Sequence, residues 1–319
     1  MTLRNLLISV SLAGLFSLGG EATAASHDRI SFRRDPGRLL LLVDGKPMGT
    51  YVYENEKILR PYFMNLKAPG DIQVTRHCPP RAGLDDDDHA SMHPGLWLAF
   101  GDVDGYDFWR NKERVKHVEF LEEPTAQGNE GSFAVLNHYI AQGRIVCEER
   151  CDISLRLLPE GHLILWESVF SSKEGEFAFG DQEEMGLGVR LATPIPVRLG
   201  KGGRIVDDRG RRNEKSVWGK VSLWCDYAGP VGDAFAGVMI MPSPRNFAPC
   251  RWHVRDYGFM AANPFAKKAF KAGPAARTVV AAGQSLSLRF GILLHSAKDE
   301  DALDLDKVYR EYSKMESAR

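Results

Sequence analysis

Hydrophobic and polar residues alternate along most of this chain with a period of two, which is the spacing of half-buried β-strands. Strands are predicted over residues 39–43, 48–53, 117–121, 134–141, 145–158, 162–170, 197–207, 217–227, 234–241, 277–280 and 286–295. Asp44-Gly45 between the first two runs is the dipeptide favoured in two-residue hairpin turns.

Helical spacing is confined to residues 300–315, where Leu305, Val308, Tyr309 and Tyr312 fall on one face. The pattern therefore predicts an all-β fold. We expect a large antiparallel β-sandwich of around twenty short strands with a short C-terminal helix. No Gly/Ser/Pro-rich linker interrupts the chain, so a single domain over residues 25–319 is expected.

The stretch 179–191 combines an apolar face with charged residues and glycines. Met185, Leu187, Val189 and Leu191 share one parity and are predicted to face the core. The opposite parity carries Gln182, Glu184, Gly186, Gly188 and Arg190. Glycines inside a strand mark close backbone approach or a bulge, so we interpret them as the floor of a ligand site, with a β-bulge as the alternative.

Two further stretches repeat this design. In residues 93–100, His93 shares a face with Gly95, Trp97 and Ala99. In residues 252–258, Trp252 and Val254 are predicted to be buried, whereas His253, Arg255 and Tyr257 point the other way, and Asp256 ends the strand.

Histidine and a carboxylate facing one cleft are the usual parts of a general acid and a general base. We predict His93, Glu184 and His253 as the catalytic groups, with His93 or His253 as the acid and Glu184 as the base. Aromatic rings stack on sugars, and Arg and Asp bind hydroxyl groups. The predicted substrate-binding residues are Arg60, His89, Trp97, Trp109, Arg190, Arg255, Asp256 and Tyr257.

A metal site is the alternative use of the same residues. His89, His93, Glu184 and His253 together could supply four ligands, but the His-x-x-x-His spacing lies in a loop rather than on a helix. The run Asp85-Asp86-Asp87-Asp88 lacks the alternating oxygen ligands of a calcium loop and is predicted to be solvated. We therefore predict no metal and no cofactor.

Composition restricts the partners. The chain has 319 residues and a formal net charge of -1, so nothing favours nucleic acid or an anionic membrane as the partner. Residues 1–24 read as a signal peptide, with Arg4 before an apolar run and Ala22-Thr23-Ala24 as the cleavage site. Periplasmic location or secretion, no further membrane span and a small-molecule or oligosaccharide ligand are expected. The five cysteines are interpreted as small buried residues rather than a disulfide framework.

Four motifs carry a resemblance to a known family. These are residues 60–63 (Arg-Pro-Tyr-Phe), 93–97 (His-Pro-Gly-Leu-Trp), 181–190 (Asp-Gln-Glu-Glu-Met-Gly-Leu-Gly-Val-Arg) and 252–258 (Trp-His-Val-Arg-Asp-Tyr-Gly). Over residues 40–295 the chain resembles exported bacterial proteins of unknown function that are labelled methane-oxygenase-like (PmoA-like). The predicted architecture more weakly resembles galactose-mutarotase-type β-sandwiches, which place His and Glu on a concave sheet for proton transfer at sugars.

The function predicted from these observations is that of an exported carbohydrate-active protein, an enzyme performing acid–base chemistry on a sugar or glycoside. Epimerase, lyase and hydrolase reactions all stay open. The alternatives are a non-catalytic carbohydrate-binding protein and a metal-dependent enzyme that uses the histidine cluster.

Overall fold

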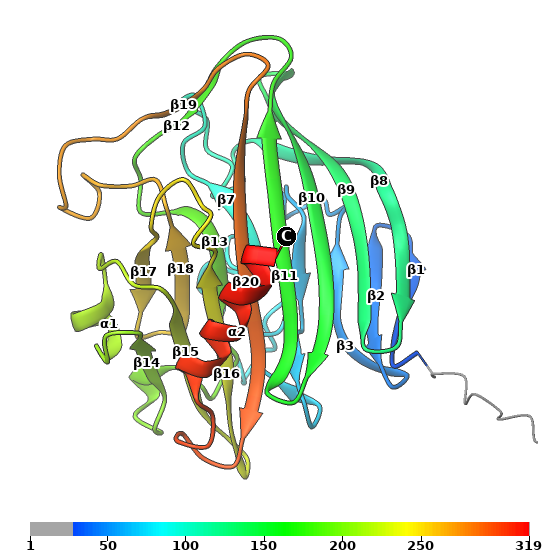
Figure 1. The fold of residues 1–319 in the computed structure, drawn as a ribbon, viewed down its shortest axis with the longest axis vertical. Coiled ribbons are helices and arrows are strands. Elements are labelled where there is room, and N and C mark those ends of the chain that lie inside the picture. The colour runs from blue at the N-terminus through cyan, green and yellow to red at the C-terminus, as the bar shows by residue number, and fades with distance from the viewer. Residues whose placement is uncertain (1–27, 319) are drawn as a thin grey trace, which may run out of the picture.

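The computed structural model describes residues 28–318, so the predicted signal peptide at 1–24 lies outside the described residues. Two large antiparallel sheets pack face to face (Figure 1), which confirms the all-β sandwich. The first, here called the site sheet, has the strand order β1-β2-β3-β4-β7-β13-β18-β17. Its strands are β1 (Ile30–Asp35), β2 (Arg38–Val43), β3 (Lys46–Val52), β4 (Tyr62–Met64), β7 (Leu96–Phe100), β13 (Met185–Arg190), β17 (Arg251–Arg255) and β18 (Phe259–Asn263).

The second sheet, here called the helix sheet, has the order β14-β15-β16-β20-β11-β10-β9-β8. Its strands are β8 (Arg114–Gln127), β9 (Glu130–Ala141), β10 (Arg144–Leu158), β11 (Gly161–Ser171), β14 (Arg204–Asp207), β15 (Cys225–Val231), β16 (Ala234–Pro242) and β20 (Ser285–Ala297). Two short pairs complete the strands: β5 (Lys67–Ala68) with β6 (Ile72–Gln73), and β12 (Phe177–Phe179) with β19 (Thr278–Val280).

The C-terminal helix forms as predicted, although it begins later. α2 (Leu305–Ala318) packs Leu305, Val308 and Tyr312 on the outer face of the helix sheet, where it covers β11, β16 and β20 (Figure 1). No helix in the described part of the chain is long and apolar enough to cross a membrane.

The core lies between the two sheets. It contains the apolar motif residues that strand alternation predicted to be buried, including Leu187 and Val189 of β13 and Trp252 and Val254 of β17. The predicted Asp44-Gly45 hairpin is confirmed, since both residues have positive φ (50° and 74°) between β2 and β3.

Two strand predictions are wrong in part. Residues 217–227 begin at the end of α1 (Asn213–Val217), and strand structure starts only at Cys225. Residues 197–207 begin with the 3-10 turn η1 (Val197–Leu199) before β14. All five cysteines lie free; four are buried as predicted, but Cys78 is half-buried.

Candidate functional site

The outer face of the site sheet carries the motif residues that point away from the core. The register of β7, β13, β18 and β17 places Trp97, Gly188, Ala261 and His253 in one row across four strands. Two small residues therefore lie between an indole and an imidazole. This row gives other side chains space to pack close to the sheet.

That space is filled by aromatic rings of the protein itself. Trp97 and Trp109 cross at 5.3 Å between ring centroids, and both are buried, with 0% and 1% exposure. Phe259 stacks against the same group and is also buried. A sugar cannot reach these rings from solvent. The prediction that Trp97 and Trp109 bind substrate by stacking is therefore wrong.

The two glycines of β13 serve this packing rather than a ligand. A Cβ on Gly188 would lie 2.8 Å from the Trp97 indole and 3.0 Å from that of Trp109. Gly186 has φ +98°, and a Cβ there would lie 2.1 Å from the carbonyl oxygen of Ala262. Our interpretation of these glycines as the floor of a ligand site is corrected to close internal packing at Gly188 and a special backbone angle at Gly186.

His93 lies within the aromatic group. Its ring stacks on Phe259 at 4.7 Å and on Trp97 at 5.1 Å, and the side of the stack nearer solvent is covered by His89 at 4.9 Å. Only 5% of His93 is exposed. Burial, followed by the neighbouring His89 and Arg190, lowers the pKa of His93 well below its usual value. The ring is therefore neutral at pH 7.

His253 contacts Glu183 through both ring nitrogens. Nδ1 lies 3.2 Å from the Glu183 main-chain oxygen, and Nε2 lies 3.2 Å from Oε2 of the same residue. Burial lowers the pKa of His253 to about 3, and the positive charge of Arg255 acts in the same direction. A neutral imidazole has one donor, so it can satisfy only one of these two acceptors at a time.

Glu183 is the reachable member of this pair. Its side chain is 29% exposed, and Arg255 donates to Oε2 at 3.1 Å through Nη2. Behind it, His253 lies 4.9 Å from Phe259 between ring centroids, so Phe259 separates His253 from His93. The structure thus brings the two predicted histidines to one region, with the carboxylate of Glu183 facing outward.

Glu184, which was predicted as the base, pairs with an arginine. Its Oε2 lies 2.7 Å from Nη2 of Arg110, and Arg110 also donates to Asp107 at 3.1 Å. The carboxylate that contacts His253 is Glu183, which the sequence reasoning missed. Strand alternation was extended back to residue 182, whereas β13 begins at Met185 and the main chain bends before it.

Arg190 and Tyr257 are held by the loop of residues 76–93, here called the acidic loop. Asp88 accepts two hydrogen bonds from Arg190, at 3.1 Å and 2.6 Å, and it also contacts Nδ1 of His89 at 2.9 Å. The guanidinium of Arg190 lies 4.5 Å above the Tyr257 ring, a cation–π contact. Arg190 is therefore buried and paired with Asp88, so it is not open to a substrate.

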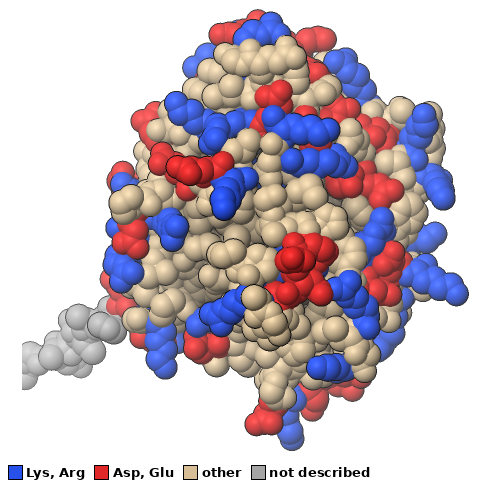
Figure 2. Space-filling model, turned by 180° about the vertical axis from the view of Figure 1, so that it is seen from behind, with Lys and Arg blue, Asp and Glu red and all other residues tan. Residues whose placement is uncertain are grey.

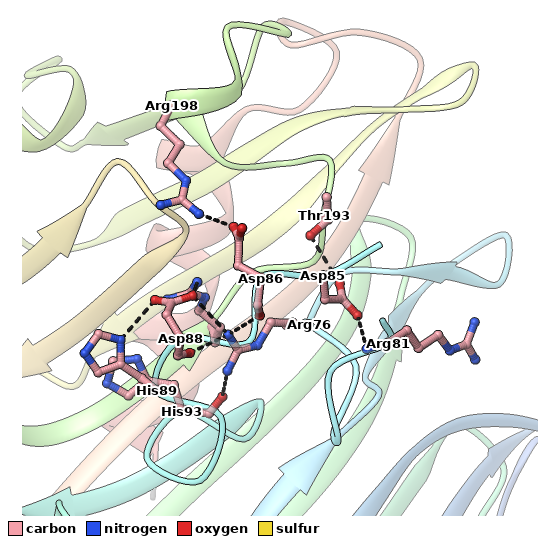
Figure 3. Close-up of polar contacts among 10 residues, drawn as sticks. Arg76, Arg81, Asp85, Asp86, Asp88, His89, His93, Thr193 and Arg198 are labelled. Atoms are coloured by element: carbon pink, nitrogen blue, oxygen red, sulfur yellow. Dashed lines mark hydrogen bonds and ion pairs between the residues drawn. The ribbon is translucent and has the colours of Figure 1, made fainter. Parts of the chain in front are cut away.

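Figure 3 shows that other members of the acidic run are also bound. Asp85 accepts hydrogen bonds from Thr193 Oγ1 at 3.2 Å and from the Arg81 amide at 3.0 Å, and Asp86 pairs with Arg198. Arg76 donates to the main-chain oxygens of Asp86 and Asp88. The prediction that the run is merely solvated is wrong, because it fastens the loop to the site sheet.

Arg60 and Asp256 also have structural partners. Arg60 is buried and donates to the main-chain oxygen of Trp109 and to Asn111 Oδ1, both at 2.9 Å, and burial lowers its pKa to about 9. Asp256 accepts from the amide of Glu214 at 2.9 Å and donates its own amide to the Glu214 carboxylate at 3.0 Å. Both residues fix loops, so the substrate-binding role predicted for them does not fit their contacts.

Acidic and basic residues are mixed over this outer face (Figure 2). Among residues 28–318, no group of three or more His, Cys, Asp and Glu side chains is placed to hold a metal ion. His89 and His93, which the metal alternative needed, stack with an interplanar angle of 20°. What the arrangement offers chemically is a buried neutral histidine behind a reachable carboxylate.

The fold and this face define a two-sheet antiparallel β-sandwich with a polar site on the outer face of one sheet. The chain belongs to the family of unknown function DUF6807, whose model matches residues 38–310. The methane-oxygenase-like label stays a prediction from sequence resemblance. No curated protein matched the sequence.

Several solved structures are similar to the chain. One is a family 36 α-galactosidase from Geobacillus stearothermophilus in complex with stachyose, at 10% identity and a TM-score of 0.42, covering 79% of this chain and 40% of that one. A galactose mutarotase-like protein from Lactobacillus casei matches at 10% identity and TM-score 0.37, covering 83% and 100% of the two chains. One from Clostridium acetobutylicum matches at 10% identity and TM-score 0.38, covering 85% and 99%. The chain thus spans less than half the length of the α-galactosidase.

Proposed function

We propose that this protein acts on a sugar or another polyol by proton transfer, with Glu183 and His253 as the acid–base pair. The observation that carries the proposal is the double contact of His253 with Glu183, in which one carboxylate oxygen and one carbonyl oxygen compete for a single imidazole proton. A proton taken up by Glu183 from a ligand hydroxyl can be shared with Nε2 of His253. The buried ring thus supports a carboxylate that meets solvent.

Binding groups surround the carboxylate. Arg255 contacts Glu183 and also lies over the Trp218 ring at 5.8 Å, and Arg110 and Glu184 form a second polar pair on the same face. Charged groups of this kind bind sugar hydroxyls, while the partly exposed indole of Trp218 offers an apolar surface. Export to the periplasm or beyond is part of the proposal and is supported by the signal-like pattern of residues 1–24.

The test is a screen of the purified mature chain against mono- and oligosaccharides with product analysis. It is followed by Glu183→Gln and Glu184→Gln as a matched pair of adjacent carboxylates. Loss of the base at Glu183 should lower kcat by roughly 10²-fold or more with little change in binding, because general acid–base catalysis contributes at least that much. Glu184→Gln should change kcat far less. An equal loss in both variants would contradict the assignment.

A non-catalytic sugar-binding role is the second candidate, favoured by the deep burial of both histidines, each only 5% exposed. In that case no turnover is detected, and Glu183→Gln shifts affinity by about 0.5–3 kcal/mol, the strength of one hydrogen bond. A chelator control belongs in the same assay. Activity lost on chelation and restored by a divalent ion would revive the metal-dependent alternative.

A further inference from the structure

A separate cavity opens on the same outer face, beside β2, β3 and β4. It has a volume of about 400 Å³, which is in the range of small-molecule sites. Its floor follows from the strand register, because Arg38, Val52 and Tyr62 pair across β2, β3 and β4. The complete lining is Arg38, Val52, Asn55, Lys57, Ile58, Tyr62, Met64, Cys78, Pro79, Pro80, Ala90 and Ser91.

The walls are mainly apolar and belong to the aromatic cluster described above. Val52, Ile58 and Tyr62 pack in the same cluster as Trp97 and Trp109. Pro79 and Pro80 of the acidic loop add further apolar surface. This composition favours a flat, apolar ligand body over a sugar.

The charged groups of the cavity are both cationic. Arg38 and Lys57 are exposed, and no acidic residue is found among the lining residues. Within residues 28–318, no carboxylate forms an ion pair with either side chain. The main chain at Lys57 is fixed, since its amide and that of Ile58 donate to Asn55 Oδ1 at 2.8 Å and 3.0 Å.

The polar groups inside the cavity are uncharged. The Asn55 amide donates to the Tyr62 hydroxyl at 3.3 Å, and the half-buried thiol of Cys78 is close enough to hydrogen-bond the same hydroxyl. Burial raises the pKa of Cys78, so the thiol is protonated at pH 7. These groups can meet a ligand hydroxyl but not a second charge.

We propose that this cavity binds a small aromatic carboxylate, with the ring between Tyr62 and the Pro79-Pro80 segment and the carboxylate paired with Arg38 and Lys57. Arginine matches a carboxylate with two parallel hydrogen bonds, and lysine adds a point charge. The lining contains neither Glu183 nor His253, so the site does not depend on the function proposed above.

Cys78 provides a built-in reporter for the test. The other four cysteines are buried, so iodoacetamide at mildly alkaline pH should label Cys78 selectively in the native protein, as read by mass spectrometry. The probe is 4-hydroxycinnamate, and 4-hydroxycinnamyl alcohol is the neutral match. We expect the carboxylate to slow labelling saturably, and to do so at concentrations at least about tenfold lower than the alcohol needs.

Variants identify the cations. The double variant Arg38→Gln/Lys57→Gln should weaken protection by 4-hydroxycinnamate about tenfold or more. The control Arg33→Gln/Lys46→Gln changes two cations outside the lining, on β1 and at the far end of β3 from Val52, and should leave protection unchanged. The proposal is overturned if the carboxylate gives no saturable protection, if the alcohol protects equally well, or if both double variants behave alike. Should the first double variant fail to fold, the comparison of carboxylate and alcohol on the unmodified chain still decides.

Discussion

Replacing Asp88 by Asn should destabilise the protein, because it leaves Arg190 without a charged partner. The Arg190 side chain is 2% exposed and that of Asp88 is 34% exposed, so one member of the pair is buried and the other reaches water. The matched control is Asp87→Asn, one position earlier in the same acidic run, where the residue is exposed.

The magnitude follows from the two exposures. Breaking a fully buried ion pair costs about 3–5 kcal/mol. Asn can still accept one hydrogen bond and water can approach from the side of Asp88, so we expect a loss of about 1–3 kcal/mol in the free energy of unfolding. For a chain of this size, Tm should fall by about 2–5 °C. Asp87→Asn should stay within about 0.5 kcal/mol of the unmodified chain.

Urea denaturation followed by tryptophan fluorescence measures the difference, and its pH dependence provides a second check. Although burial raises it, hydrogen bonds from His89 and Arg190 bring the pKa of Asp88 below its usual value. The stabilisation is therefore present above the unfolded pKa, about 3.9, and is lost as pH falls through the lower folded pKa. Equal unfolding free energies for the Asp88 and Asp87 variants at pH 7 would refute this account.

Two further predictions concern buried positions. Gly188→Ala should cost about 1–3 kcal/mol of stability, because the new methyl group overlaps the Trp97 and Trp109 rings, whereas Gly175→Ala, which meets open space, should be neutral; chemical denaturation of both variants checks this. Burial raises the pKa of Glu149, although Ser168 and Asn137 donate hydrogen bonds to it, so the folded chain holds this proton more tightly than the unfolded chain. The contribution of Glu149 to stability should fall as pH rises above the unfolded pKa of about 4.3. Glu149→Gln should remove this pH dependence from the free energy of unfolding measured between about pH 4 and 8. If the same pH dependence persists in the variant, another group causes it.

Sequence alternation was sufficient to predict the sandwich, the Asp44-Gly45 hairpin and the terminal helix. The reason is that burial on one side of a strand imposes a period of two that propensity alone would not. The same alternation correctly assigned Leu187 and Val189 to the core and His253 to the outer face. It failed just before β13 begins, because Glu183 lies in a bend where side chains do not alternate between the two faces.

The roles of the outward-facing residues could not be predicted from the sequence. Strand alternation shows which face of the sheet a side chain lies on, but it does not show which other segments pack over that face. Trp97 lies on the predicted face, yet Trp109, twelve positions further along the chain, folds back from the turn after β7 and buries it. Asp88 and Arg190 are separated by about a hundred positions in the chain and meet only through the folded acidic loop. Such long-range pairings carry no local signal in a single sequence.

The position of α2 affects how ligands can be sought. The helix α2 lies on the outer face of the helix sheet (Figure 1). Glu183, His253 and the cavity beside β4 lie on the outer face of the site sheet, on the opposite side of the sandwich. A tag joined to the C-terminus would tether the molecule to a sensor surface by the face that holds neither site. Sugars and aromatic acids in the flowing sample would then meet both sites unobstructed, in a single immobilised orientation.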